Sequence, residues 1–330
     1  MTLALCVVGC GESAHNWLDG LRGHIDDVTL FFASEHVEDA RRYNDEFAGA
    51  GVFDSYEEAA ADPRVEAMFF LTPHHIHREC ALVAAGHGKH VLVEKPIARN
   101  LDEAREMVRA ARDAGVVLAV AEPTRYMAAV DRCKELMAEG AIGDLRLVQV
   151  QDEHYSPTHD WRNDAELRGG GELVDGGIHY VDILINLGGL PETVYAVTPP
   201  RILESEGEDG VAVTVRLPGG AVGLLNVSAG TPSSKSDIWT QVTGTKGKLS
   251  FGQSETTLTL DTIDGSRAID LGDTDDADVR TFKDFQAAIA EGRAPVMSGE
   301  EGLRDLAVVV GAYESLERHT EVPLPSVEIE

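Results

Sequence analysis

The sequence predicts an α/β protein of two domains: an N-terminal doubly wound sheet, then an α/β domain built on an open, mostly antiparallel sheet. The first observation is length, because 330 residues suit about two domains of roughly 100–200 residues each. The second is an alternation of short apolar runs with helical patterns over the first 120 residues, which is typical of a parallel sheet covered on both faces. The third is a change to period-two alternation further on, which indicates antiparallel strands.

We place the first domain at residues 1–122. Its expected strands are Leu3–Val8, Val28–Phe32, Ala67–Leu71, Val91–Val93 and Val116–Ala119. Helical spacing falls between them at Ser13–Leu21, Glu38–Phe47, Glu57–Ala61, Arg78–Ala85 and Leu101–Ala114. Such a sheet binds its ligands beyond the carboxyl ends of the strands.

The second domain is expected to cover residues 123–330. A helix near Ala129–Glu139 leads into a strand at Leu145–Gln151, and a glycine-rich, helix-forming segment follows at Gly169–Leu187. Two helices, at about Val279–Glu291 and Glu300–Glu317, end the chain. Between these parts we expect strands at Val211–Leu217, Ala221–Ser228, Asp237–Thr243, Lys248–Phe251, Thr256–Leu260 and Ala268–Leu271.

The chain is strongly acidic, with 57 Asp and Glu against 28 Lys and Arg and a net charge of −29. A nucleic-acid backbone and an anionic membrane surface would both repel it, so we expect neither as a partner. The apolar runs are far shorter than the roughly 18 residues of a spanning helix. The four cysteines form no CxxC pair, which favours a reduced, cytoplasmic protein.

A phosphate-binding turn is predicted where the first strand meets the first helix. Gly9, Gly11 and Ala14 match the G-x-G-x-x-G/A fingerprint of dinucleotide-binding domains. Gly9 would permit the tight turn, Gly11 would let the backbone approach a pyrophosphate, and Ala14 would allow close helix–strand packing. Glu12 and Ser13 complete the helix start, whose N–H groups favour an anion. The alternative is that the two glycines only make a turn.

The end of the second strand bears on the choice of cofactor. An acidic residue there would accept from the ribose 2′-OH of NAD and repel the 2′-phosphate of NADP. Ser34 occupies this position, with Glu35 next and Arg41 and Arg42 further on. The serine slightly favours NADP over NAD, and both remain open.

Two further strands end in residues suited to chemistry. Thr72, Pro73 and three histidines, of which His77 is the last, follow one strand. The histidines would not converge on one ion from an extended turn, so we predict no metal site. Glu94 and Lys95 end the next strand before Pro96, which holds Lys95 extended. A lysine there could polarise a substrate hydroxyl, or simply face solvent.

The glycine-rich segment carries a possible acid/base pair. On one helix, Asp175 and His179 would be four residues apart and share a face. A histidine beside a carboxylate suits proton transfer near neutral pH, although a histidine of the protein core is the ordinary alternative. The preceding glycines cost helix stability, which suggests that another group approaches the backbone closely.

Taken in order, these motifs resemble the Gfo/Idh/MocA family of nicotinamide-dependent oxidoreductases over nearly the whole chain. The resemblance rests on the following segments: Gly9–Ala14, Thr72-Pro73 with His77, Glu94-Lys95-Pro96, Arg125-Tyr126, Gly140–Gly143, Trp161-Arg162 and Asp175–His179. It implies a Rossmann domain and a second domain whose open sheet packs against another copy in a dimer or tetramer. Ser34 departs from the acidic residue usual in the family, which leaves NAD in doubt.

The resemblance also implies the roles of individual residues. Lys95 would orient the substrate and polarise its oxygen, Asp175 would hold a neighbouring hydroxyl, and His179 would be the general base or acid. Pro73, His77 and Glu94 would flank the cofactor, together with Thr72 and Lys95. The Lys95–Pro96 bond matches a peptide that is often cis in the family.

The predicted activity is hydride transfer between NAD(P) and a secondary alcohol or ketone of a sugar, inositol or related polyol. Additional substrate-facing candidates form a polar, aromatic-containing set suited to a polyhydroxylated ring: Arg125, His154, Tyr155, Trp161 and Arg162. Two alternatives remain open. One is an enzyme that oxidises its substrate transiently with a recycled NAD, and the other is a catalytically silent nucleotide-binding sensor.

Overall fold

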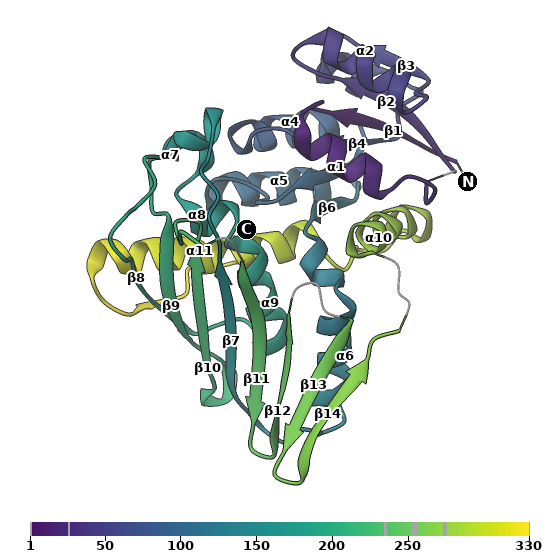
Figure 1. Ribbon diagram of the computed structural model, residues 1–330. Coiled ribbons are helices and arrows are strands. Elements are labelled where there is room, and N and C mark those ends of the chain that lie inside the picture. Colours follow the sequence, from purple (N-terminus) through teal and green to yellow (C-terminus); the bar gives the residue numbers. More distant parts are fainter. Residues whose placement is uncertain (1, 26, 234–235, 253–255, 273–275, 330) are drawn as a thin grey trace. The chain divides into compact units, whose positions relative to one another are not determined.

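Six parallel strands form the first sheet, in the order β3-β2-β1-β4-β5-β6 (Figure 1). The computed structural model describes residues 2–25, 27–233, 236–252, 256–272 and 276–329. The strands are β1 (Leu3–Val8), β2 (Val28–Ala33), β3 (Gly51–Phe53), β4 (Ala67–Phe70), β5 (His90–Glu94) and β6 (Leu118–Ala121). The order reverses beside β1, so the carboxyl ends of β1 and β4 flank the topological switch point at which such sheets bind ligands.

The helices that alternate with these strands lie where the sequence predicts them. They are α1 (Glu12–Gly20), α2 (Val37–Glu46), α3 (Tyr56–Ala61), α4 (His77–Gly86) and α5 (Leu101–Ala114). α5 begins after Asn100, whose side chain accepts a hydrogen bond from the Glu103 N–H, and ends at Gly115 in the left-handed conformation. The predicted doubly wound fold is confirmed. The short edge strand β3 was not predicted, because three residues carry too little periodicity.

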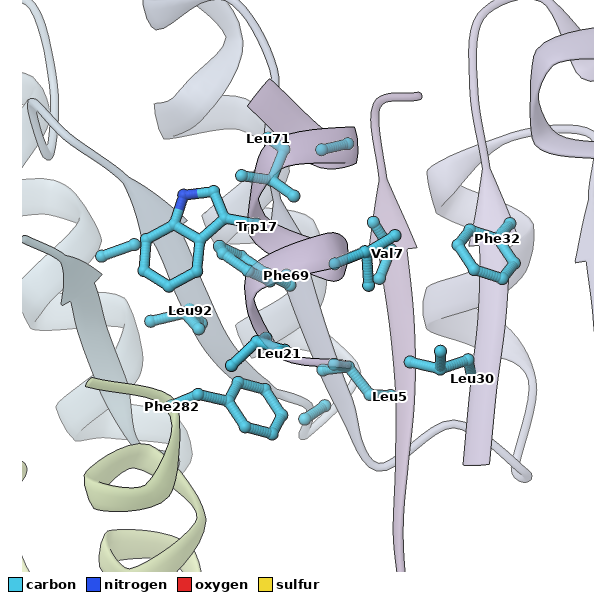
Figure 2. Packing of buried hydrophobic residues seen from close by; sticks show 14 of the residues in the cluster. Leu5, Val7, Trp17, Leu21, Leu30, Phe32, Phe69, Leu71, Leu92 and Phe282 are labelled. Atoms are coloured by element: carbon cyan, nitrogen blue, oxygen red, sulfur yellow. The ribbon is translucent and has the colours of Figure 1, made fainter. Parts of the chain in front are cut away.

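The core of this first unit includes a helix from far along the chain. The unit comprises residues up to Pro123, Asp278–Leu303 and the last residues from Glu328. Phe282 of α10 (Ala277–Glu291) is fully buried in a cluster with Leu5, Leu21 and Phe69 (Figure 2). The sequence assigned α10 to the second domain, since order along the chain does not reveal which core an amphipathic helix covers.

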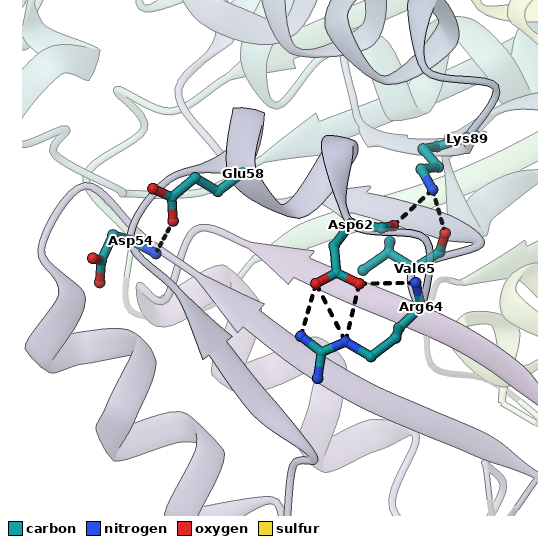
Figure 3. A network of polar contacts seen from close by, with 6 residues as sticks. All are labelled: Asp54, Glu58, Asp62, Arg64, Val65 and Lys89. Carbon is teal, nitrogen blue, oxygen red and sulfur yellow. Dashed lines mark hydrogen bonds and ion pairs between the residues drawn. The ribbon is translucent and has the colours of Figure 1, made fainter.

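A polar network supports the segment that leads into β4 (Figure 3). The Lys89 ammonium donates to the carbonyl oxygens of Asp62 and Val65, at 2.9 and 2.6 Å. The Asp62 carboxylate accepts from the Arg64 guanidinium and backbone N–H, and these bonds lower its pKa to about 2. The turn before β4 is therefore held by Lys89 and by Arg64.

Nine strands form the sheet of the second unit, in the order β14-β13-β12-β11-β7-β10-β9-β8-β15. Their bounds are β7 (Leu145–Glu153), β8 (Thr193–Val197), β9 (Gly210–Arg216), β10 (Val222–Ser228), β11 (Asp237–Gly244), β12 (Gly247–Gly252), β13 (Thr257–Thr262), β14 (Gly265–Asp270) and β15 (Val322–Pro323). Among the described strand pairs, β7 and β10 are parallel and the others antiparallel, which agrees with the predicted mostly antiparallel sheet. β8 and β15 were not predicted.

One face of this sheet is covered by helices. α9 (Ile178–Gly188) contacts β7 and β10, and α6 (Ala128–Ala138) contacts α9 and β13. Along β7 burial alternates, with Val148, Val150 and Asp152 on the buried face. The long helix α11 (Gly299–Arg318) begins in the first unit and continues in the second. In the part of the chain that the structure describes, no helix has the length and apolar character to span a membrane.

Phe282→Ala tests the contribution of α10 to the first core. Removal of a fully buried phenylalanine should lower the free energy of unfolding by about 3–5 kcal/mol, because a cavity remains. The measurement is urea denaturation followed by circular dichroism. Ile263→Ala, at a side chain 98% exposed, is the control and should leave the midpoint unchanged. Equal midpoints for the two variants would contradict the placement of α10 in this core.

Candidate functional site

The fingerprint turn lies very close to Leu71, the residue directly after β4. Gly9 has φ +93°, and a Cβ there would lie 2.3 Å from the carbonyl oxygen of Leu71. Its N–H donates to the Ala33 carbonyl at the end of β2, at 2.9 Å. Only glycine fits such a conformation and approach. The predicted role of Gly9 in a tight turn therefore agrees with its geometry.

Gly11 differs from Gly9 because its own surroundings are open. It has φ −101° and ψ −168°, an extended conformation open to any residue, and a Cβ there would meet no atom within 4 Å. No side chain caps the start of α1, and the Gly11 carbonyl accepts a hydrogen bond from Tyr43 Oη at 2.7 Å. Ala14 is fully buried, as the third position of the fingerprint requires. The first-turn N–H groups of α1, at Glu12 to Ala14, are thus well placed to bind a pyrophosphate.

Charged side chains of α2 lie near this turn. Ser34 directly follows β2 and is half-buried. Arg42 pairs with Asp39 at 3.0 Å, and its guanidinium lies over the Tyr43 ring. Burial, followed by the field of Asp39, raises the pKa of Cys10 to about 12, and Arg42 opposes this rise. Both charges are therefore close to the fingerprint turn.

His77 connects the loops that follow β4 and β5. Its ring nitrogens lie 2.9 Å from the carbonyl oxygens of Thr72 and Pro96. The side chain is fully buried, and desolvation lowers its pKa to about 4, so the ring is neutral near pH 7 and donates to one carbonyl at a time. His77 thus positions Thr72-Pro73 and the cis Lys95–Pro96 peptide relative to each other.

Two buried polar atoms in this region have no hydrogen-bond partner among the described residues. Glu94 Oε1 accepts from the Trp17 indole N–H at 3.0 Å, but its Oε2 has no partner. The same holds for Oγ1 of Thr72, at the end of β4. Buried polar atoms are normally satisfied, so these two suit a polar ligand. With the open space at Gly11, they show that the residues present fit a dinucleotide.

Asp175 and His179 lie in the second unit, on two helices instead of the single predicted one. α8 (Glu172–Asp175) ends before Gly176, and α9 begins at Ile178. The intervening glycines keep helical dihedral angles, but the Gly177 N–H donates to the Glu172 carbonyl five residues back, which widens the turn. The Thr124 hydroxyl donates to the His179 carbonyl at 3.1 Å and fixes the start of α9.

Three of the predicted substrate residues come together beside α8. Arg162 Nε donates to Asp175 Oδ2 at 3.1 Å, and the Arg162 guanidinium lies 4.4 Å from the centroid of the Trp161 ring. The arginine keeps one carboxylate oxygen of the buried Asp175 engaged. Tyr155, six residues before Trp161 in the sequence, is 52% exposed and forms an isolated antiparallel β-bridge with Gly230.

Arg125 is buried within the second unit. Its Nε donates to Asp182 Oδ1 at 2.7 Å, and its Nη2 lies 3.8 Å from Asp305 Oδ1. These contacts connect the segment after β6 to α9 and α11. They give Arg125 a clear part in orienting α9, the helix that carries His179; its predicted contact with substrate stays a prediction.

The glycine run before α8 accommodates protein side chains. A Cβ at Gly170, which has φ +147°, would lie 2.3 Å from Tyr313 Oη, and one at Gly171 would lie 2.0 Å from Glu208 Oε2. Tyr313 Oη accepts from the Gly171 N–H and contacts Glu208 Oε1, both at 3.0 Å. Burial raises the pKa of the Glu208 carboxyl, and it raises the pKa of the Tyr313 hydroxyl well above its usual value. The close approach inferred from these glycines is thus made by groups more than 30 residues away along the chain.

His154 has an acidic partner that the sequence analysis did not single out. Its Nδ1 lies 3.0 Å from Asp152 Oδ1, and this hydrogen bond raises the pKa of His154. Glu172, also overlooked, lies close to both residues. The available signal was an acidic residue on the buried, otherwise valine-lined face of β7.

Together, the fold and these residues define a protein with a dinucleotide-binding domain followed by a mixed-sheet α/β domain. Residues 3–122 match the model of the oxidoreductase family with an NAD-binding Rossmann fold, and residues 130–250 match that of the GFO/IDH/MocA C-terminal domain. The chain belongs to the Gfo/Idh/MocA family of oxidoreductases, as its motifs predict.

Curated relatives agree with this assignment. The 1,5-anhydro-D-fructose reductase of Ensifer adhaerens is 32% identical over 310 residues, which cover 91% of this chain and 92% of that protein. The trans-1,2-dihydrobenzene-1,2-diol dehydrogenase of Mus musculus is 35% identical over 65% of this chain and 63% of its own length. A solved structure titled levoglucosan dehydrogenase in complex with NADH has the same fold, with a TM-score of 0.90 at 24% identity over 98% of this chain and all of that chain. This chain is an NAD(P)-dependent oxidoreductase.

Gly9 and Gly11 should respond differently to alanine. Gly9→Ala should lower the free energy of unfolding by about 2 kcal/mol or more, because the new Cβ meets the Leu71 carbonyl in a strained conformation. Gly11→Ala should leave stability unchanged and weaken NAD(P)H binding roughly tenfold or more, because its methyl group enters the open space in front of α1. Thermal unfolding and fluorescence titration with NADH and NADPH measure the two effects. Unchanged dinucleotide affinity in Gly11→Ala would contradict the binding role of this turn.

Proposed function

We propose that the enzyme transfers hydride between the nicotinamide of NAD(P) and a secondary alcohol or ketone of a sugar, inositol or related polyol. The observation that carries this proposal is the presence of Lys95, Asp175 and His179, in family order, in a chain that belongs to this oxidoreductase family. The relative that matches most of the chain is named for reduction of an anhydro-sugar ketone, which supports the substrate class.

In the direction of oxidation, His179 removes the proton from the reacting hydroxyl. A bound, oxidised nicotinamide would supply the hydride acceptor for the carbon that carries this hydroxyl. Lys95 donates a hydrogen bond to the reacting oxygen, which favours the alkoxide character that develops as the proton leaves. In reduction the roles reverse, and His179 returns the proton to the oxygen.

Asp175 and its neighbours hold the rest of the substrate. Arg162 holds the Asp175 carboxylate in place through Oδ2, and this carboxylate accepts a hydrogen bond from a hydroxyl beside the reacting carbon. Trp161 offers an aromatic face to ring C–H groups, and Tyr155 and His154 offer polar atoms to further hydroxyls. A neutral polyol also suits a chain of net charge −29 better than a polyanion.

Lys95→Ala and His179→Ala test the chemical step separately from cofactor binding. Each should lower kcat roughly 100-fold or more on a sugar and polyol panel, since general acid–base groups contribute about that much. NAD(P)H affinity should change little. Stoichiometric NAD(P)H formation separates a dehydrogenase from an enzyme with a recycled cofactor. If neither the parent enzyme nor any variant turns over a substrate although NAD(P)H binds, the silent-sensor alternative replaces this proposal.

We propose NADP as the preferred cofactor, with NAD also accepted. Ser34 follows β2 with no carboxylate of its own to repel a 2′-phosphate, and Arg42 places a positive charge near the same turn. Asp39 pairs with Arg42, which limits how far that charge favours NADP.

Ser34→Asp should shift the ratio of kcat/KM for NADP to that for NAD toward NAD by roughly tenfold or more, through like-charge repulsion and a new ribose acceptor. Steady-state kinetics with both cofactors measure this ratio. Ser34→Asn is the control, because asparagine is similar in size to aspartate but uncharged. A strong NAD preference in the parent enzyme would overturn the proposal.

We also propose that the nine-stranded sheet joins copies of the chain into a dimer or tetramer. The face opposite α9 carries half-buried side chains, among them Leu147, Leu224 and Trp239, that a second sheet could cover. For the enzyme's compartment we propose the cytoplasm, because all four cysteines are free and buried and none forms a disulfide.

A further inference from the structure

Three side chains of types that bind metals converge in the second unit, and none of them is assigned to proton or hydride transfer. Asp152 and His154 come from the end of β7, and Glu172 is the first residue of α8. One ligand atom from each residue lies within 4.8 Å of those from the other two. The sequence predicted no metal site because its histidine-rich segment after Thr72-Pro73 would not converge on one ion; it did not consider Asp152, His154 and Glu172, of which Glu172 is brought to the other two only by folding.

The distances between these ligand atoms are close to those between the ligands of a bound metal ion. Zinc holds nitrogen and oxygen ligands at about 2.0–2.2 Å, so ligand atoms around it lie roughly 3.3–3.6 Å apart. His154 Nδ1 and Asp152 Oδ1 are already 3.0 Å apart. Small side-chain rotations would bring the whole set to coordination distance.

Burial is the second, independent observation that indicates a ligand. Asp152 is 1% exposed, and its Oδ2 is buried with no hydrogen-bond partner among the described residues. An unsatisfied carboxylate oxygen away from water is costly unless a cation or donor binds it. On this face of β7 the preceding positions are Val148 and Val150, so packing alone does not call for an acid.

Gly176 leaves room for the buried Glu172 side chain. Glu172 is 6% exposed, and a Cβ at Gly176 would lie 2.0 Å from its Oε1. Any residue other than glycine at position 176 would therefore displace the carboxylate. The glycine makes room for Glu172 to reach toward the end of β7.

A protonated His154 is the simplest alternative partner for these acids. An imidazolium would neutralise one of the two carboxylates, whereas a divalent cation would neutralise both and also accept the imidazole nitrogen as a ligand. One nitrogen and two oxygen donors suit zinc and related transition metals, while magnesium prefers an octahedral set of oxygens.

We propose that Asp152, His154 and Glu172 bind one divalent transition-metal ion, for which zinc is the best match. A fourth position would remain for water or another oxygen ligand. The ion would connect the end of β7 to α8, three residues before Asp175. Its binding does not depend on the proposed hydride transfer.

The test is calorimetric titration of the chelator-treated, full-length protein with zinc chloride. Millimolar magnesium in the buffer occupies exposed carboxylates, which are numerous in this acidic chain. We expect one equivalent of zinc to bind with micromolar affinity or tighter and to raise the Tm. Asp152→Asn and Glu172→Gln, which preserve side-chain shape, should each weaken binding roughly 100-fold or more.

Asp144→Asn is the matched control, since Asp144 is exposed and immediately precedes β7, at the opposite end of the strand from the cluster. It should bind zinc like the parent. Circular dichroism and NAD(P)H binding check the fold of each variant. His154→Ala, at a side chain only partly buried, provides a further variant, and it should remove the visible absorption bands of the cobalt-loaded protein.

Absence of a one-equivalent zinc site in the parent protein would overturn the proposal. So would folded Asp152→Asn or His154→Ala variants that bind zinc as tightly as Asp144→Asn does. In either case the cluster would be an Asp152–His154 ion pair beside Glu172. Neither result would bear on Lys95, His179 or the proposed oxidoreductase activity.

Discussion

The first unit depends on one close passage, that of the β1–α1 turn beneath the carbonyl of Leu71. Gly9 permits it, because a Cβ would lie 2.3 Å from that oxygen. The passage lets α1 start directly at the switch point of the sheet, with its N–H groups uncapped. The neighbouring loops are held in turn by His77, which lies between the carbonyls of Thr72 and Pro96. We therefore expect backbone N–H groups of this turn, more than basic side chains, to bind a pyrophosphate.

In the second unit, polar contacts add to the apolar packing that orients the residues proposed for chemistry. Arg125 connects the segment after β6 to Asp182 of α9 and approaches Asp305 of α11. Arg162 engages Asp175, which ends α8. The Arg125–Asp182 pair is buried. A buried ion pair contributes little net stability, but removing one partner is strongly destabilising, so this pair holds α9 in one arrangement relative to the segment after β6. The Arg125–Asp182 contact therefore helps to fix α9, the helix that carries His179.

Much of the fold was predictable because its signals are local. Helix α5 was predicted with its observed bounds from its regular helical spacing, and the structure shows a side-chain cap at Asn100 and a left-handed Gly115 at its ends. The strands β3 and β15 were missed because three and two residues carry too little pattern, and the five-residue strand β8 was missed as well. The helix across Asp175 and His179 was predicted as continuous, whereas Gly176 and Gly177 divide it by a wider turn. That difference arises from the hydrogen bond between the Gly177 N–H and the Glu172 carbonyl, which residue spacing in the sequence does not reveal.

The sequence by itself determined the class of fold, the dinucleotide fingerprint and the family, because these depend on local patterns and on motifs in a fixed order along the chain. Only the tertiary structure decided which groups meet across long separations. It placed Phe282 in the first core, filled the space beside Gly170 and Gly171 with Tyr313 and Glu208, and brought Asp152, His154 and Glu172 together. The physical reason is that burial and close packing act between surfaces, and the side chains that share a surface need not be neighbours in sequence.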